Sequence, residues 1–547
     1  MKRIILIIAA VFYSCCHIWA SDNEDRTFNV AKNLDIFNTL FKQLTLHYVD
    51  TVNAEKVITA GINGMLRSID PYTIYIPDES EKDFKFMTTG EYGGIGAIIS
   101  YREDYVIINE PYENMPAHKS GLLPGDKIAF IDGENMKGKM PADVSEKLKG
   151  TPGTEVEVKI LRGDNKKPMK FDIVRENIYM NPVYYYGMMN DSIGYIQLSN
   201  FTDGCSDEVK KAFLDLRSQG MKSLILDLAA NPGGLLGEAV DIVNMFVPKG
   251  ETVVTTKGRG NKTLSIYKTP SQPVDTEIPL VIIVDSGSAS ASEIVAGALQ
   301  DMDRAVIVGE RTFGKGLVQG TYPVAFNGQL KVTTAKYYIP SGRCIQAIKY
   351  SGNDSEPPVE VPDSLTSEFK TAGGRIVRDG RGITPDVEVE PKAGHAISFN
   401  LYADNLLFDF ANEYYHNNPV AVPMEEFAIS DSVYDEFMKF VKEKDFKYEL
   451  PTQSAFEKLV QSAKDDEIYE NNKDLFDTLQ AAIKPDIQKE LELYKDEISH
   501  LLLIEISKYY YFQRGKMYMS LKKDEMLGPA MDILKNPARY KEVLNSD

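Results

Sequence analysis

The chain has 547 residues, 43% of them hydrophobic and 26% charged, a balance typical of a globular protein with about three or four domains. Its net charge of −19 argues against nucleic acid as a partner, because phosphate contacts need a basic surface and the sequence has no long run of Lys or Arg. No His or Cys residues cluster at the spacing of zinc ligands, so we expect no metal site.

The first 20 residues have the layout of a secretory signal peptide. Two basic residues precede an apolar run from Ile4 to Phe12, and Ala20 offers a small residue before a cleavage point. The apolar run is too short to span a bilayer. We therefore expect export across the inner membrane and a periplasmic location. Cys15 and Cys16 leave lipid attachment open, and only that modification would place the protein at a membrane.

Residues 21–88 are predicted to form an N-terminal helical region. Apolar residues recur at helical spacing from Val30 to Phe41 and again from Val57 to Leu66. Asp70-Pro71 then predicts a turn that ends this region. The pattern indicates helices that form a cap or an arm, and no catalytic residues stand out in it.

Residues 89–176 change to a pattern of glycine-rich turns and short strands. Gly94-Ile95-Gly96-Ala97 leads into an apolar run, and a Gly-Leu-Leu-Pro-Gly-Asp segment ending at Asp126 precedes another. A turn at Asp132-Gly133 and a helix over residues 142–149 follow. In this order, the elements resemble a PDZ domain of the bacterial kind.

The glycine-rich loop suggests what this domain binds. Backbone N–H groups of Gly94, Ile95, Gly96 and Ala97 can hold a terminal carboxylate, and the adjoining strand edge can pair with an extended peptide. We expect these four residues to contact the C-terminal end of a polypeptide. The alternative is a small β domain without a ligand.

Residues 177–395 alternate between apolar strands and helices, which predicts an α/β domain. Predicted strands cover 192–198, 223–228, 280–285 and 305–309, and predicted helices cover 207–219, 237–246 and 291–299. Three of the strands run into turns of small residues, which are Asn231-Pro-Gly-Gly234, Ser286–Ser292 and Phe313–Gly316. Because sites in α/β sheets gather beyond the carboxyl ends of strands, we expect these turns to share one cleft.

Ser290 lies at the start of a predicted helix, where a serine is ordinarily explained as an N-cap. A nucleophilic serine also needs a base, and none of the six histidines lies between residues 177 and 394. A Ser-His-Asp triad inside this core is therefore unavailable, unless another part of the chain donates its histidine. Lys315 is the best candidate base, provided that burial disfavours its charged form. The alternative for Lys315 is an ordinary surface lysine.

The segment from Gly309 to Lys315 also resembles a phosphate-binding P-loop. Such a loop needs Ser or Thr after the lysine to hold Mg²⁺, and a helix must follow to bind phosphate. Here Gly316 follows, and Leu317-Val318 continues as a strand. Nucleotide binding is therefore disfavoured.

Two blocks, Ser286–Asp301 and Gly309–Gln319, resemble the signature segments of the C-terminal processing peptidases, the tail-specific proteases of peptidase family S41. The resemblance spans about residues 30–395. It implies a multidomain α/β fold, in which a β-rich PDZ domain precedes a crotonase/ClpP-like α/β protease core, with helical regions at both ends.

The resemblance also implies roles for individual residues. Ser290 would be the nucleophile and Lys315 the general base, while Gln319 would orient the lysine amine. Asp301 falls where the family has an acidic residue in a supporting role. The oxyanion hole would be formed by backbone N–H groups, those of Ala291 and of either Gly233 or Gly234.

These roles together describe a serine endopeptidase that needs no metal or cofactor and cleaves exported proteins recognised by their apolar C-terminal ends. One alternative is an inactive PDZ scaffold that only binds peptides, and another is a hydrolase of small esters. Residues 396–547 are predicted to be helical, with an apolar stripe over residues 487–501. A homodimer through the helical regions, or docking of a partner on this stripe, is a hypothesis that the stripe prompts.

Overall fold

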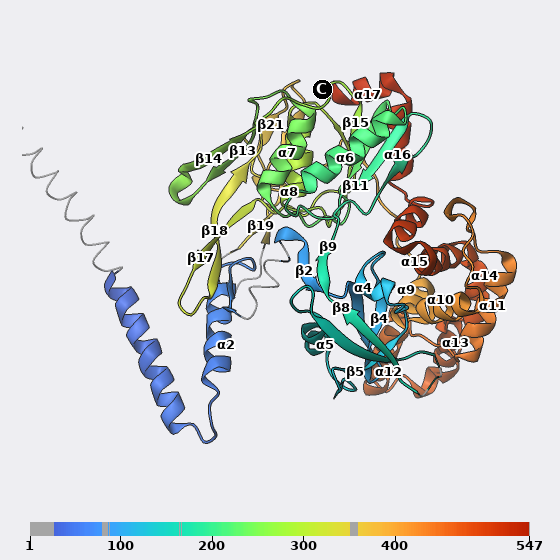
Figure 1. The fold of residues 1–547 in the computed structure, drawn as a ribbon. Helices are drawn as coiled ribbons and strands as arrows, with labels where there is room; N and C mark the ends of the chain where they lie inside the picture. The colour runs from blue at the N-terminus through green and yellow to red at the C-terminus, as the bar shows by residue number, and fades with distance from the viewer. Residues whose placement is uncertain are drawn as a thin grey trace, which may run out of the picture. The chain divides into compact units, whose positions relative to one another are not determined.

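The structure is a computed structural model that describes residues 27–78, 86, 88–163, 165, 167–350 and 359–545. The predicted signal peptide, with the cysteines at 15 and 16, lies outside the described residues. The chain divides into two compact units, of which the first holds the described residues up to Ile76 together with 321–332 and Tyr350. All other described residues belong to the second unit, and Figure 1 shows the course of the chain.

The first unit contains the predicted N-terminal helices. One helix covers residues 27–47, and α2 (Ala54–Arg67) begins where the Asn53 side chain accepts a hydrogen bond from the Lys56 N–H at 2.9 Å. No helix among the described residues is long and apolar enough to cross a membrane.

The predicted turn at Asp70-Pro71 is closed by its own aspartate. The buried Asp70 carboxylate accepts the N–H groups of Tyr72 and Thr73, each at 2.8 Å. The chain then enters β1 (Ile74–Ile76), which pairs antiparallel with the first residues of β18 (Gln329–Tyr338).

The second unit begins with a PDZ-like sheet of antiparallel strands in the order β3-β4-β5-β7-β8, with β3 at its edge. Asp132 and Gly133 connect β5 to β6 with φ values of 48° and 82°, which is the positive-φ turn that tight hairpins favour. The elements of this region are β2 (Glu91–Gly94), β3 (Ala97–Arg102), β4 (Tyr105–Pro111), α4 (Pro116–Lys119), β5 (Lys127–Ile131), β6 (Glu134–Asn135), α5 (Pro141–Leu148), β7 (Glu155–Leu161), β8 (Met169–Val174) and β9 (Glu176–Tyr179).

Strand β4 of this sheet is covered on both faces. Val106 and Ile108 on β4 point into the core of the PDZ-like region, because alternate residues of a strand face opposite sides. Ile107, between them, packs into a hydrophobic cluster formed by the C-terminal helices. Arg102 and Asp409 add an ion pair across the same contact.

The predicted α/β domain contains a sheet with the strand order β10-β11-β12-β15-β16-β23, parallel from β11 to β23. The sequence prediction of its central strands and of its three helices is confirmed to within about two residues at each end. The elements are β10 (Tyr185–Met188), β11 (Ile193–Gln197), α6 (Cys205–Ser218), β12 (Ser223–Asp227), α7 (Leu236–Phe246), β15 (Leu280–Val284), α8 (Ala291–Asp301), β16 (Val306–Gly309) and β23 (Val387–Glu388).

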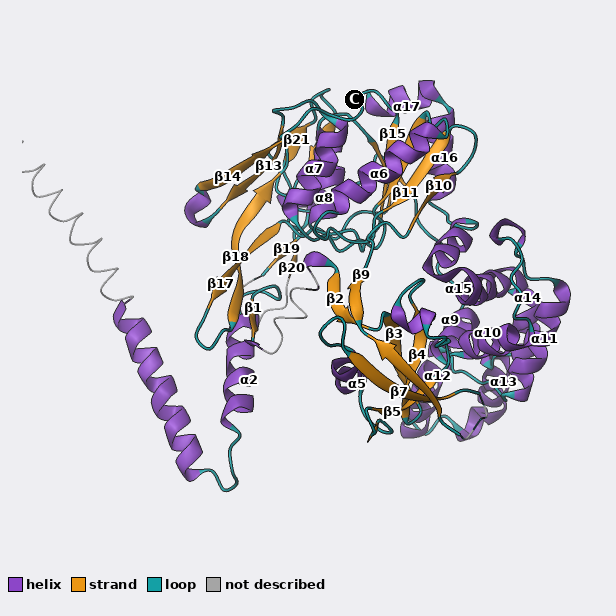
Figure 2. Cartoon of the chain, in the orientation of Figure 1, coloured by secondary structure: helices purple, strands orange, loops and turns teal. Residues whose placement is uncertain are grey.

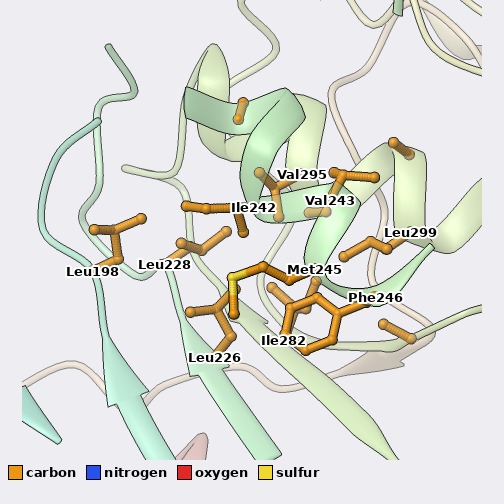
Figure 3. Close-up of a cluster of buried hydrophobic side chains, with 14 of the residues drawn as sticks. Leu198, Leu226, Leu228, Ile242, Val243, Met245, Phe246, Ile282, Val295 and Leu299 are labelled. Atoms are coloured by element: carbon orange, nitrogen blue, oxygen red, sulfur yellow. The ribbon is translucent and has the colours of Figure 1, made fainter. Parts of the chain in front are cut away.

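Each face of this sheet packs on different helices. In Figure 3, Leu226 and Ile282 lie on the face that packs on α7, with Met245 and Phe246. The other face carries Ile225 and Ile283, and it is covered by α16 (Leu527–Lys535) near the end of the chain. Because both faces are buried, the strands read as continuous apolar runs, which is why the sequence predicts them well.

A second sheet in this region was not predicted, apart from the strand that begins at Leu317-Val318. Its strands have Thr and Lys interspersed among apolar residues, and most of their residues are partly buried or exposed, so that no continuous apolar run identifies them. They are β13 (Thr252–Lys257), β14 (Thr263–Lys268), β17 (Leu317–Pro323) and β18.

The C-terminal region contains helices only, as Figure 2 shows. Leu491 and Ile498, from the stripe over residues 487–501, are buried in the hydrophobic cluster of this region itself. The stripe therefore packs within the chain, and a homodimer through the helical regions or docking of a partner stays a hypothesis. The helices are α9 (Ala396–Ala403), α10 (Leu406–Asn417), α11 (Asp431–Glu443), α12 (Pro451–Asp465), α13 (Lys473–Ile483), α14 (Ile487–Leu493), α15 (Lys495–Leu521), α16 and α17 (Pro537–Leu544).

The two cysteines among the described residues, Cys205 and Cys344, are free thiols. In this part of the chain, no group of three or more His, Cys, Asp or Glu side chains is placed to hold a metal ion.

Candidate active site

Two of the three predicted turns are bonded directly to each other. The buried Asn231 carbonyl accepts the Ala289 N–H and the Ser292 hydroxyl, both at 2.9 Å. The Asn231 side chain also donates to the Leu198 carbonyl at 2.7 Å. The turns after β12 and β15 therefore share one site, as the sequence predicted.

Ser290 precedes α8 in an uncommon backbone conformation. Its φ of 56° and ψ of −109° differ from the extended conformation that an N-cap serine normally takes. A residue other than glycine is strained at positive φ, and such strain persists only where the surroundings enforce it. The bond from the Ser290 N–H to Glu293 Oε2, at 2.8 Å, is one of the contacts that hold this turn.

Glu293 connects the serine turn to the lysine loop. Its Oε2 accepts the N–H groups of Ser290 and Lys315, both at 2.8 Å, and its Oε1 accepts the Gly314 N–H at 2.7 Å and the Thr312 hydroxyl at 2.6 Å. The side chain is fully buried. Burial raises the pKa of this carboxyl to about 6, although the four hydrogen bonds oppose the shift. This residue was not predicted from the sequence.

The loop around Lys315 is packed against the rest of the domain. A Cβ atom on Gly314 would lie 2.3 Å from the Ala347 Cβ, and one on Gly316 would lie 2.8 Å from the Gln346 nitrogen. The Gly316 N–H also donates to Gln346 Oε1 at 2.8 Å. Lys315 itself is half-buried, which argues against an ordinary surface lysine.

Gln319 lies on β17, four residues after the lysine. Its amide nitrogen donates to the Thr333 hydroxyl on β18 at 3.2 Å. This bond fixes the side chain between two strands, and its predicted role in orienting the lysine amine stays a prediction.

Asp301 lies at the opposite end of α8 from Ser290. Asp301 is ten residues after Ala291, the first residue of α8. At a rise of 1.5 Å per residue, it lies about 15 Å from Ala291 along the helix axis. It is buried, pairs with Arg343 at 2.9 Å and accepts the Ser341 N–H at 2.9 Å. Asp301 therefore stabilises the segment of residues 341–343, and any effect of Asp301 on the site is indirect.

The two glycines after Asn231 lie so close to neighbouring atoms that no side chain fits at either position. Gly233 has a φ of 94°, and a Cβ atom there would lie 2.6 Å from the Ala289 carbonyl oxygen and 2.8 Å from the Ser290 Cβ. Its N–H donates to Asn231 Oδ1 at 2.9 Å. Gly234 has a φ of 152°, and a Cβ atom there would lie 2.2 Å from the Phe201 carbonyl oxygen.

Asp227 is a buried carboxylate at the end of β12, four residues before this turn. It accepts the Ala229 N–H at 2.8 Å and the Tyr195 hydroxyl. Burial raises the pKa of the Asp227 carboxyl to about 7, and the negative charges of Asp524 and Asp285 act in the same direction.

The raised pKa of Asp227 predicts how stability depends on pH. The folded protein keeps this proton up to about pH 7, whereas an unfolded chain loses it near pH 4, so the free energy of unfolding falls as pH rises between these values. Asp227→Asn is expected to remove this slope and to raise the free energy of unfolding at pH 8 by about 1–3 kcal/mol. Urea denaturation from pH 4 to 8 measures both effects, with the exposed Asp477→Asn as control. An unchanged slope in Asp227→Asn would contradict the assignment.

The predicted peptide-binding loop lies between β2 and the edge strand β3. Gly96 has a φ of 73°, and its carbonyl accepts the Tyr112 N–H at 3.0 Å. The buried Ile95 carbonyl accepts the Ala117 N–H at 2.7 Å. The loop is therefore anchored through its carbonyl groups, and it leads at Ala97 directly into the strand at the open edge of the described sheet.

Comparison with known families agrees with this organisation. Residues 107–162 match the PDZ domain family and residues 192–353 match peptidase family S41. Residues 397–534 match the family described as the C-terminal helical domain of a probable PDZ-protease.

Among curated relatives, the carboxy-terminal-processing protease of Bartonella bacilliformis is 36% identical over 379 residues, which cover 68% of this chain and 85% of the relative. A probable CtpA-like serine protease of Staphylococcus aureus is 36% identical over 331 residues, covering 60% of this chain and 65% of the relative. Among solved structures, the photosystem II D1 C-terminal processing protease is 26% identical with a TM-score of 0.36, covering 65% of this chain and 88% of that chain. With its PDZ domain, its S41 domain and a relative matched over most of its length, the chain belongs to the carboxy-terminal-processing proteases and is a serine endopeptidase of family S41.

Proposed function

We propose that Ser290 and Lys315 form the catalytic pair of this peptidase, and that its substrates are exported proteins whose apolar C-terminal ends bind the PDZ domain. The observation that supports the pair most directly is the shared carboxylate. Glu293 accepts the backbone N–H groups of both residues at 2.8 Å, so that the serine turn and the lysine loop belong to one site.

In the proposed mechanism, neutral Lys315 takes the proton from Ser290 as the serine oxygen attacks a peptide carbonyl. The lysine then gives the proton to the leaving amine, and an acyl-enzyme forms. Water, activated by the same lysine, releases the acyl group. This mechanism requires a lysine that is neutral near pH 7, and Lys315 is half-buried rather than fully exposed.

The proposed oxyanion hole consists of the N–H groups of Ala291 and Gly234. Ala291 is the first residue of α8, where helix N–H groups lack partners within the helix and the helix dipole favours negative charge. Between the two glycines, the Gly233 N–H already donates to Asn231, which favours Gly234. In this arrangement Gly233 lets the turn approach Ser290 closely.

For substrate capture, we propose that the tail of the substrate adds to the edge of β3 while its carboxylate binds the loop of Gly94, Ile95, Gly96 and Ala97. The position of β3 at the edge of its sheet supports this proposal, since strand addition needs unpaired backbone groups. We also propose a periplasmic enzyme with a signal peptide at residues 1–20 and domain limits at residues 88, 176 and 395.

The test of this function is digestion of an unfolded protein that ends in apolar residues, with the products identified by mass spectrometry and Ser290→Ala as the blank. Amidating the substrate tail is expected to slow cleavage by about tenfold or more, because it removes the charged acceptor that the loop N–H groups bind. The same substrate blocked only at its N-terminus serves as control. Equal rates for the free and the amidated tail would contradict carboxylate recognition, and equal cleavage by the Ser290→Ala blank would contradict the catalytic assignment.

A further inference from the structure

Tyr337 is a second residue, besides Glu293, that connects the serine turn to the lysine loop. Its side chain is 1% exposed, and its hydroxyl lies 2.5 Å from the Lys315 carbonyl oxygen and 3.1 Å from the Ser290 carbonyl oxygen. The backbone N–H of Tyr337 also donates to the Gly316 carbonyl at 3.0 Å. A single residue of β18 therefore contacts both predicted catalytic residues through their main chains.

The contacts of Tyr337 and Glu293 are complementary. Glu293 accepts the N–H groups of Ser290 and Lys315, and the Tyr337 hydroxyl faces the carbonyl groups of the same two residues. Both side chains are buried. The two catalytic residues come from separate turns, 25 positions apart, so their separation depends on contacts of this kind rather than on the chain between them.

We propose that Tyr337 is a positioning residue that sets the separation of Ser290 and Lys315. This inference rests on the proposed function of that pair. A general base acts only within hydrogen-bond reach of the proton that it takes, and a misplacement of about 1 Å can cost about a hundredfold in rate. The phenol has one proton for two carbonyl acceptors. It therefore fixes the Lys315 carbonyl firmly and the Ser290 carbonyl more weakly, and the hydroxyl itself takes no part in the chemistry.

The experiment compares Tyr337→Phe with Tyr338→Phe in the full-length protein. Tyr338 is the matched control because successive residues of a strand face opposite sides, and its ring lies under the Lys257 ammonium at 4.1 Å. On an unfolded peptide substrate with a free apolar tail, Tyr337→Phe is expected to lower kcat by about tenfold to a hundredfold with KM within about twofold. Tyr338→Phe is expected to keep the wild-type values.

A pH profile separates positioning from a merely structural role. The acid limb of kcat/KM reports the pKa of the essential base in the free enzyme. In Tyr337→Phe the lysine is expected to be less confined and better hydrated, so this limb should move to higher pH. Rates are taken per folded molecule, below the melting temperature of each variant, so that loss of fold does not count as loss of rate. An unchanged kcat, or a lower kcat with an unmoved limb, would overturn the proposal.

Lys315→Ala, measured beside these variants, distinguishes failure of this inference from failure of the proposed function. If Lys315→Ala stays active, the catalytic pair itself is wrong. If Lys315→Ala is inactive while Tyr337→Phe behaves like wild type, the pair stands and the positioning role of Tyr337 is refuted.

Discussion

Replacing either Ser290 or Lys315 by alanine is expected to lower kcat for peptide cleavage by at least about a thousandfold. Loss of the nucleophile removes the acyl-enzyme route, and loss of a general base alone costs about a hundredfold to ten-thousandfold. The residues act as one unit, so the double variant should be about as slow as the slower single variant rather than slower by the product of the two effects. Burst-phase and steady-state kinetics on an unfolded substrate measure these rates.

The sequence offers a matched control for each of these variants. Ser286 is exposed in the same turn as Ser290, and Lys336 is exposed on β18. Ser286→Ala and Lys336→Ala should therefore retain wild-type rates. If Lys315→Ala kept most of its activity while Ser290→Ala lost it, the serine would need another base, and the assignment of the pair would have to be abandoned.

Glu293→Gln is expected to destabilise the protein by about 2–4 kcal/mol and to lower kcat by about a hundredfold. Each carboxylate oxygen accepts two hydrogen bonds in a fully buried position. An amide replaces one oxygen with a donor, which cannot accept a hydrogen bond. At the Oε2 position its nitrogen would leave the N–H groups of Ser290 and Lys315 unsatisfied, and at the Oε1 position it would leave the Gly314 N–H unsatisfied, while the Thr312 hydroxyl can turn to accept. In both orientations the lysine loop loses a bond to the buried side chain, so the loss of stability and the loss of rate have the same origin.

Urea denaturation and steady-state kinetics test this prediction together. Glu277→Gln, at an exposed position, should change neither quantity. Glu293→Asp keeps both acceptor oxygens but shortens the side chain by one methylene group, and it should fall between the wild type and Glu293→Gln. A Glu293→Gln variant with wild-type stability and rate would show that the carboxylate is not needed to hold the two turns.

The sequence predicts those parts of the fold in which buried residues follow one another in a recognisable apolar pattern. The central strands, such as β12 and β15, are buried on both faces and read as apolar runs, so their ends and the following turns could be located. The hairpin of β21 (Glu368–Lys370) and β22 (Ile376–Arg378) lies in a segment that reads as a polar connection. Next to it, Arg375 bonds to Asp303 and Asp386, a partnership between distant residues that no local pattern reveals.

The candidate site likewise contains residues that a local sequence pattern predicts and residues that only the fold brings together. Ser290 and Lys315 could be proposed because small-residue turns follow apolar strands and because no histidine lies between residues 177 and 394. Glu293, three residues after Ser290, reads locally as half of a capping box, and only the fold brings the lysine loop to it. Asp301 shows the converse, since proximity in sequence to Ser290 suggests proximity in space, whereas the helix between them carries it away.

The packing of α16 on the central sheet also bears on the order in which the protein matures. Ile225 and Ile283 are covered by residues such as Ala530, which are synthesised about 250–300 positions later. At about 5–20 residues per second, the stretch from residue 396 to residue 544 takes roughly 10–30 s to synthesise. During that interval, a nascent chain already contains Ser290 and Lys315. The face of the central sheet that carries Ile225 and Ile283, however, is not yet covered by α16. The peptidase core is therefore completed only once residues 527–535, which form α16, have been made.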